Sequence, residues 1–152
     1  MLIEKGASLE AVDKDGETAL MLASSNGEAD TVRVLVEYGA SLETVDREGM
    51  TALMWASREG HADTALVFVE QAASLEAVDR EHGMTALLWA SYEGHADTVG
   101  VLVAHGASLE AVDEEGKTAL QLASDNDNRK VAKVLCKHGA RGALCYADKN
   151  DL

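Results

Sequence analysis

The residues of this chain that could do chemistry are its carboxylates, five histidines and two cysteines, and their spacing decides whether they form a site. Asp13-Lys14-Asp15-Gly16 is similar to the start of a calcium-binding loop. With Gly16 at the sixth position of such a loop, Leu22 falls at the twelfth, where a bidentate glutamate is required. The spacing therefore argues against a calcium site.

The histidines follow a pattern that indicates structural roles. His61 and His95 hold the same place in two related segments, each at the start of a predicted helix. His105 and His138 each precede a glycine that ends a predicted helix, where an imidazole can meet free carbonyl groups. His82 alone falls outside the pattern, and one imidazole is no catalytic or metal site.

Nothing else in the sequence supports catalysis. Cys136 and Cys145 lack the further ligands that a zinc ion needs. There is no glycine-rich phosphate loop followed by lysine, and no serine on a strand-to-helix turn. We therefore predict that the chain is not an enzyme and binds no metal and no cofactor. Two cysteines are too few for a disulfide scaffold and favour a reducing, cytoplasmic location.

Composition and charge narrow the partners. The 152 residues are 47% hydrophobic and 26% charged, enough apolar content for a buried core. Thirteen Lys and Arg stand against 27 Asp and Glu, for a net charge of −14. Nucleic acids and anionic membranes are polyanions, so neither is expected as a partner. No apolar run approaches the ~20 residues of a membrane-spanning helix.

The sequence repeats itself, which explains why the histidines recur. Gly6-Ala7-Ser8-Leu9-Glu10-Ala11-Val12-Asp13 returns unchanged at 106–113 and with one substitution each at 39–46 and 72–79. The four aspartates that end the phrase are 13, 46, 79 and 113. His82 is the one inserted residue; without it, segments 46–78 and 79–112 agree at 25 of 33 positions. We predict a single domain, 1–152, with a partial unit 1–12, repeats 13–45, 46–78, 79–112 and 113–145, and a polar tail 146–152.

Each unit predicts two short helices and an extended arm. A threonine that can cap a helix precedes an Ala-Leu pair in every unit, at positions 18, 51, 85 and 118. In the second unit another helix is predicted from about His61 through Glu70. Glycines 39, 106 and 139 end the equivalent helices of the other units, where a left-handed conformation is expected. Ala72 takes that place in the second unit, so a strained or altered cap is expected there.

The 33-residue period, with Asp-x-x-Gly-x-Thr-x-Leu, then Ala, Gly-His and Gly-Ala, resembles the ankyrin repeat. The family's Thr-Pro-Leu-His is here Thr-Ala-Leu followed by Met21, Met54, Leu88 or Gln121. The resemblance implies an all-α solenoid of stacked helix-turn-helix units with projecting hairpin loops. It also implies a non-catalytic protein-protein interaction module whose concave groove binds another protein.

Carried over position by position, the resemblance places groove residues on the hairpin tips and first helices. The predicted partner-binding residues are Arg47, Glu48, Met50, Arg58, Glu59, Arg80, Glu81, Met84, Tyr92, Glu93 and Lys117. Met50 and Met84 are expected to be exposed and to form a small adaptable patch on adjacent hairpins. Tyr92 replaces a charged residue and is a candidate contact, whereas Trp55 and Trp89 are interpreted as core.

Charge is divided unevenly along the chain. Residues 1–116 carry 23 acidic and 6 basic side chains. The negative electrostatic field of these residues favours a partner with a basic segment. The last repeat instead carries five basic residues, Arg129, Lys130, Lys133, Lys137 and Arg141. Polar residues are expected on the outer helix of a terminal repeat, so a solvated cap is favoured over a phosphate-binding patch.

The N-terminal unit leaves a second interpretation open. Residues 1–12 supply only the last turn of a preceding helix, which predicts an incompletely covered face and self-association through the N-terminal end. The alternative function is therefore a self-associating structural segment. High identity between adjacent repeats fits a consensus-like engineered scaffold without a native partner equally well.

Overall fold

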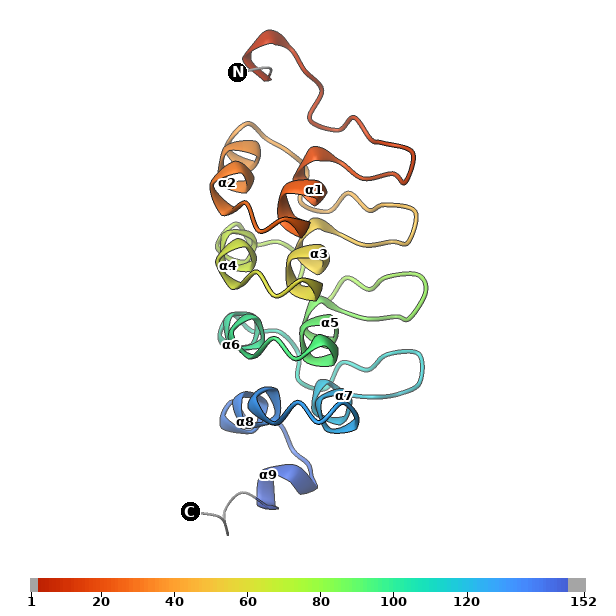
Figure 1. Cartoon of the computed structure of the whole chain (residues 1–152), viewed down its shortest axis with the longest axis vertical. Helices are drawn as coiled ribbons and strands as arrows, with labels where there is room; N and C mark the ends of the chain where they lie inside the picture. The colour runs from red at the N-terminus through yellow and green to blue at the C-terminus, as the bar shows by residue number, and fades with distance from the viewer. Residues whose placement is uncertain (1–2, 148–152) are drawn as a thin grey trace.

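The computed structural model describes residues 3–147 as a stack of helix pairs (Figure 1). The first helices are α1 (Ala19–Ser25), α3 (Ala52–Arg58), α5 (Ala86–Glu93) and α7 (Ala119–Asp125). The second helices are α2 (Ala29–Glu37), α4 (Ala62–Glu70), α6 (Ala96–Ala104) and α8 (Arg129–Lys137). A 3-10 turn, η1 (Ile3–Lys5), precedes the stack and a short helix, α9 (Ala143–Ala147), follows it. The all-α repeat architecture is confirmed.

The helices form two columns, and the extended arms project to one side beyond the first helices (Figure 1). Each first helix contacts the next first helix, and each second helix contacts the next second helix. Leu53, Phe68, Leu87 and Leu102 are at most 1% exposed and fill the space between neighbouring units. Because each unit buries its faces on its neighbours, one continuous core runs along the stack.

The four threonines start the first helices as the sequence predicts. The backbone amide of Met54 donates to Thr51 Oγ1 at 3.3 Å, and the same bond recurs at Thr18, Thr85 and Thr118. Each bond satisfies an amide that has no partner within its helix. Helix starts are therefore local features of the sequence.

Histidines join the repeats, which confirms their structural role. His61 Nε2 hydrogen-bonds to the carbonyl of Ser25 at 2.9 Å, and His95 Nε2 makes the same bond to the carbonyl of Arg58. Asn128 replaces the histidine in the last repeat and donates to the carbonyl of Ser91 at 3.0 Å. The imidazoles of His105 and His138 hydrogen-bond the carbonyls of Val101 and Val134, as expected near helix ends.

A carboxylate ladder joins the arms. Glu43 Oε1 accepts the backbone amide of Ser74 at 2.8 Å, and Glu10 and Glu76 bond Ser41 and Ser108 in the same way. The repeated arm glutamates therefore connect each unit to the next.

The C-terminal end differs from the sequence prediction. Residues 143–147 form α9, which packs against α8. The first two residues of the predicted polar tail, 146–152, therefore belong to this helix, and the rest of the tail lies outside the described residues. Cys136 of α8 and Cys145 of α9 form a disulfide with 5.3 Å between their Cα atoms. The reducing interpretation of the cysteines did not anticipate this bond, because α9 is what folds Cys145 back onto α8.

Ala72 adopts the strained cap that the sequence predicts. Its φ is +58°, whereas glycines 39, 106 and 139 hold the equivalent place with φ between 92° and 102°. Only glycine enters this region without a steric cost.

Ala72→Gly is expected to raise the free energy of unfolding by about 0.5–1 kcal/mol, because relief of backbone strain exceeds the entropy that glycine adds to the unfolded chain. Urea denaturation measures the change. Gly106→Ala is the matched control: a Cβ there meets nothing within 4 Å, so the expected loss of about 1 kcal/mol comes from the backbone alone. A less stable Ala72→Gly variant would contradict this account.

Candidate interaction groove

The surface formed by the hairpin tips and the first helices is called the groove here. A pocket of about 570 Å³ opens on it between the third and fourth repeats. It is lined by Arg58, Glu81, His82, Met84, Trp89, Tyr92, Glu93, Asp113, Glu114, Glu115, Lys117 and Leu122. These residues come from the tips of two hairpins and from α3, α5 and α7.

One aspartate shapes each hairpin tip. Asp46 Oδ1 accepts the backbone amides of Glu48 and Met50 at 2.9 Å, and Asp113 accepts those of Glu115 and Lys117. Asp46 and Asp113 are buried although they are charged. The hydrogen bonds from backbone amides offset the cost of removing these carboxylates from water. The tips are therefore rigid platforms for the exposed side chains between them.

The expected exposure of the two methionines is wrong. Met50 is 0% exposed and Met84 is 6% exposed. Each methionine immediately precedes a helix-capping threonine, so the chain has already turned back into the stack at this position. Glu17 and Lys117 occupy the same place in the outer repeats and are half-buried.

The other predicted groove residues reach the surface to different degrees. Arg47, Glu48, Glu59, Arg80, Glu81, Tyr92 and Glu93 are exposed. Arg58 and Lys117 are half-buried. The structure brings six of the predicted residues together in the pocket: Arg58, Glu81, Met84, Tyr92, Glu93 and Lys117.

The two tryptophans differ because His82 is inserted between their repeats. Trp55 Nε1 donates to Asp46 Oδ2 at 2.8 Å. In the next repeat, the backbone N and Nδ1 of His82 both lie 3.3 Å from Asp79 Oδ2. Trp89 Nε1 is buried and has no hydrogen-bond partner among the described residues. His82 therefore bonds to Oδ2 of Asp79, the oxygen equivalent to the one that accepts the Trp55 indole in the preceding repeat.

Aromatic rings form one wall of the pocket. Trp89 packs edge-to-face with His82 at 5.4 Å and with Tyr92 at 6.3 Å between ring centroids. Trp89 is 6% exposed, which confirms its interpretation as core, whereas Trp55 is half-buried. Tyr92 is 42% exposed, so its ring is accessible from the groove.

Three cations of the groove, Arg58, Arg80 and Lys117, are engaged within the chain, whereas the guanidinium of Arg47 has no hydrogen bond or ion pair within residues 3–147. The Arg58 guanidinium lies 5.4 Å from the Trp55 ring centroid and 4.9 Å from that of Trp89. Arg80 donates to the carbonyl of Arg47 at 3.1 Å. Lys117 pairs with Asp125 at 2.9 Å and with Glu115 at 3.1 Å, and these hydrogen bonds raise its pKa.

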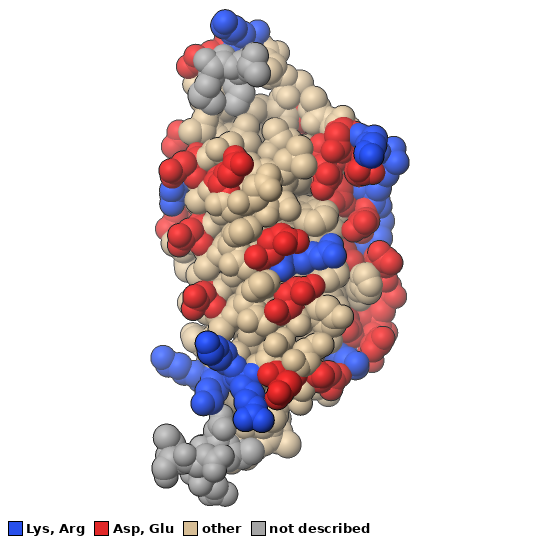
Figure 2. Space-filling model, viewed as in Figure 1, with Lys and Arg blue, Asp and Glu red and all other residues tan. Residues whose placement is uncertain are grey.

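Five glutamates of the groove are not engaged in this way. Within residues 3–147, the side chains of Glu48, Glu59, Glu81 and Glu93 form neither hydrogen bonds nor ion pairs, and neither does Glu114. Figure 2 shows acidic side chains spread along the edge formed by the arms. The groove therefore offers a partner more uncompensated negative charge than positive charge.

A basic cluster lies elsewhere. Figure 2 shows basic side chains gathered over α8 at the C-terminal end of the stack. Residues 129, 130, 133, 137 and 141 are all exposed. Among the residues that the structure describes, one ion pair, Arg129 with Asp127 at 3.3 Å, joins this cluster to a carboxylate. Its place on the outer helix of the last repeat agrees with a solvated cap.

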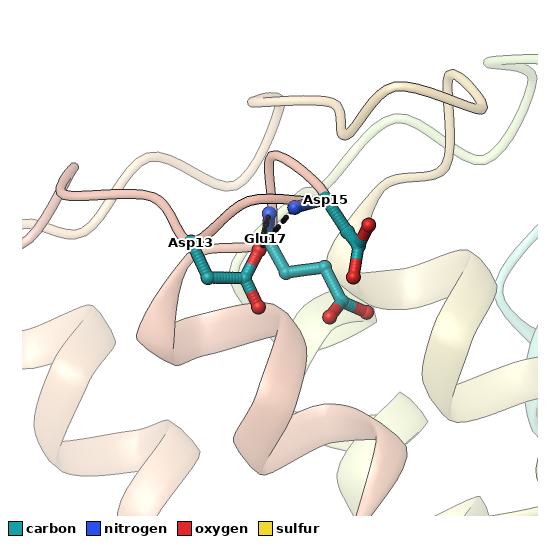
Figure 3. A group of neighbouring side chains, drawn as sticks. All are labelled: Asp13, Asp15 and Glu17. Carbon is teal, nitrogen blue, oxygen red and sulfur yellow. Dashed lines mark hydrogen bonds between the residues drawn. The ribbon is translucent and has the colours of Figure 1, made fainter.

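Three carboxylates meet at the first hairpin tip (Figure 3). Asp13, Asp15 and Glu17 have oxygens within 4.8 Å of one another. Asp13 Oδ1 accepts the backbone amides of Asp15 and Glu17 at 2.9 and 3.0 Å, and these bonds lower the pKa of Asp13. The cluster therefore has a structural explanation as another aspartate-closed hairpin.

The pKa of Glu17 is raised by partial burial and by the nearby carboxylates of Asp13, Asp46 and Asp15. A raised pKa in the folded state favours the protonated form. Its contribution to stability is therefore present below the ordinary value of 4.5 and is lost as the pH rises through the folded pKa.

Glu17→Gln is therefore expected to raise the melting temperature slightly near neutral pH, because it removes the disfavoured charge. The gain should vanish below the ordinary pKa, where Glu17 is protonated in both states. Thermal unfolding followed by circular dichroism, at neutral pH and at a pH below 4.5, measures the change in melting temperature. An equal gain at both would show that charge at Glu17 is not the cause.

Comparison with known proteins agrees with this geometry. The family model described as "Ankyrin repeats (3 copies)" matches residues 1–79 and residues 73–144. No curated protein matches the chain. Within the described residues, no helix is both long enough and apolar enough to cross a membrane. Proteins built from such repeats generally act as protein-interaction modules and are typically non-catalytic. By the matched residues and by its fold, the chain belongs to the ankyrin-repeat family.

Proposed function

We propose that the chain is a non-catalytic module that binds a basic segment of a partner protein in the groove. The observation that carries this proposal is the asymmetry between the two kinds of charge. Arg58, Arg80 and Lys117 are held by contacts within the chain. Among the described residues, five groove glutamates have no side-chain hydrogen bond or ion pair: Glu48, Glu59, Glu81, Glu93 and Glu114. A cationic segment would supply the missing counter-charges.

The shape of the groove supports a rigid mode of binding. The hairpin tips are joined by backbone hydrogen bonds, from Arg80 N to Glu48 O at 2.8 Å and from Glu114 N to His82 O at 3.0 Å. Side chains between such tips lose little freedom when a partner binds, which lowers the entropic cost of association. The net charge of −14 also accelerates encounter with a basic partner at low salt.

The test starts with a partner captured from a lysate and then purified. Isothermal titration calorimetry is expected to show affinity that falls with added salt. The variant E48Q/E59Q/E93Q is expected to bind about tenfold more weakly, since three surface ion pairs of about 0.5 kcal/mol each sum to about one factor of ten.

The matched control removes three exposed carboxylates from the second-helix side. E28Q/E37Q/E70Q changes the net charge equally and is expected to keep nearly the wild-type affinity. Equal losses in both variants would show a general charge effect without a groove site. Self-association that rises with concentration, with no partner bound, would favour the structural role instead.

A further inference from the structure

We propose that the pocket between the third and fourth repeats holds one lysine or arginine side chain of the partner's basic segment. This inference rests on the proposed function and adds which part of the groove recognises a single cation. It is carried by the charge of the pocket, by its aromatic wall and by a comparison between two adjacent repeats.

The lining of the pocket is complementary to a cation. Five carboxylates and two cationic side chains, Arg58 and Lys117, line it. The charge of Lys117 is already balanced by Glu115 and Asp125. The free carboxylates of Glu81, Glu93 and Glu114 come from two successive hairpins and the end of α5, so a cation between them meets acceptors from several sides. Such charge-assisted hydrogen bonds are stronger than neutral ones.

The chain itself shows how this groove seats a cation one repeat earlier. The guanidinium of Arg58 lies within 5.4 Å of the ring centroids of both Trp55 and Trp89. Tyr92 holds the position equivalent to Arg58 in the next repeat and brings an exposed ring in place of the cation. Arg58 lines the same pocket, which also carries the carboxylates of Glu81, Glu93 and Glu114 and the exposed ring of Tyr92. A partner cation would then contact the Tyr92 ring as well as the carboxylates.

The inserted His82 helps to form this pocket. It lengthens the third hairpin by one residue and packs against Trp89 at 5.4 Å. Its carbonyl accepts the backbone amide of Glu114, which aligns the fourth hairpin beside the third. The second repeat has no equivalent residue, so the proposed cation site belongs to one place along the groove.

A peptide array provides the probe. Peptides of about 15 residues, with two to four lysines or arginines among neutral residues, are screened on the wild-type chain, and the tightest binder is labelled. Each cation of that peptide is then changed to glutamine. Affinities are measured for the wild type, for E81Q/E114Q in the pocket, and for E48Q/E59Q in the same groove outside it.

The expected result is a coupling confined to one peptide cation. Its replacement should weaken binding about tenfold with the wild type and with E48Q/E59Q, but less than about twofold with E81Q/E114Q. Tyr92→Leu should weaken binding of the intact peptide, and Tyr92→Phe should restore it, because the ring face is what contacts the cation.

The outcomes separate the two proposals. If both double variants couple equally to every peptide cation, the pocket is not the recognition site and the groove function stands. If no basic peptide and no basic partner binds the wild type, both proposals are overturned. Circular dichroism of the double variants checks folding, and the four glutamates are exposed, so no loss of structure is expected.

Discussion

The groove depends on one recurring interaction, the acceptance of backbone amides by the aspartate at the start of each hairpin. Asp46 bonds two amides through Oδ1 and the Trp55 indole through Oδ2. It thereby fixes the tip, orients the first helix beneath it and tolerates its own burial. Where His82 takes Oδ2 of Asp79 instead, the indole of Trp89 loses its partner and the adjacent pocket acquires its particular wall.

The distribution of charge follows from the same repetition. Arm glutamates at equivalent positions each bond to the next arm, so much of the negative charge is structural. Glu48, Glu81 and Glu114 at the hairpin tips are different, because no described residue neutralises them, whereas Glu115 pairs with Lys117. The excess of acid in the sequence therefore separates into a part that stabilises the stack and a part that is free to meet a partner.

Much of the fold was predictable because its signals are local. The threonine caps and the left-handed glycines depend on a few neighbouring residues and recur along the units, and Ala72 is strained because it replaces one of these glycines. The groove was less predictable. The expectation of exposed methionines was wrong because Met50 follows the turn at residues 46–49 and directly precedes the cap of α3, where the chain has re-entered the stack. The bond between Cys136 and Cys145 required α9, for which the sequence offered no repeat to follow.

The sequence by itself determined the number of units, their two helices and the strongly negative charge, since all of these follow from residue type and spacing. Only the tertiary structure decided which charges are free. Arg58 is held by rings from two repeats, and Lys117 by carboxylates on a hairpin and a helix. The contact of Arg58 with Trp89 joins two repeats and depends on their stacking. Lys117, Glu115 and Asp125 lie in one repeat and are brought together by the fold of its hairpin and first helix.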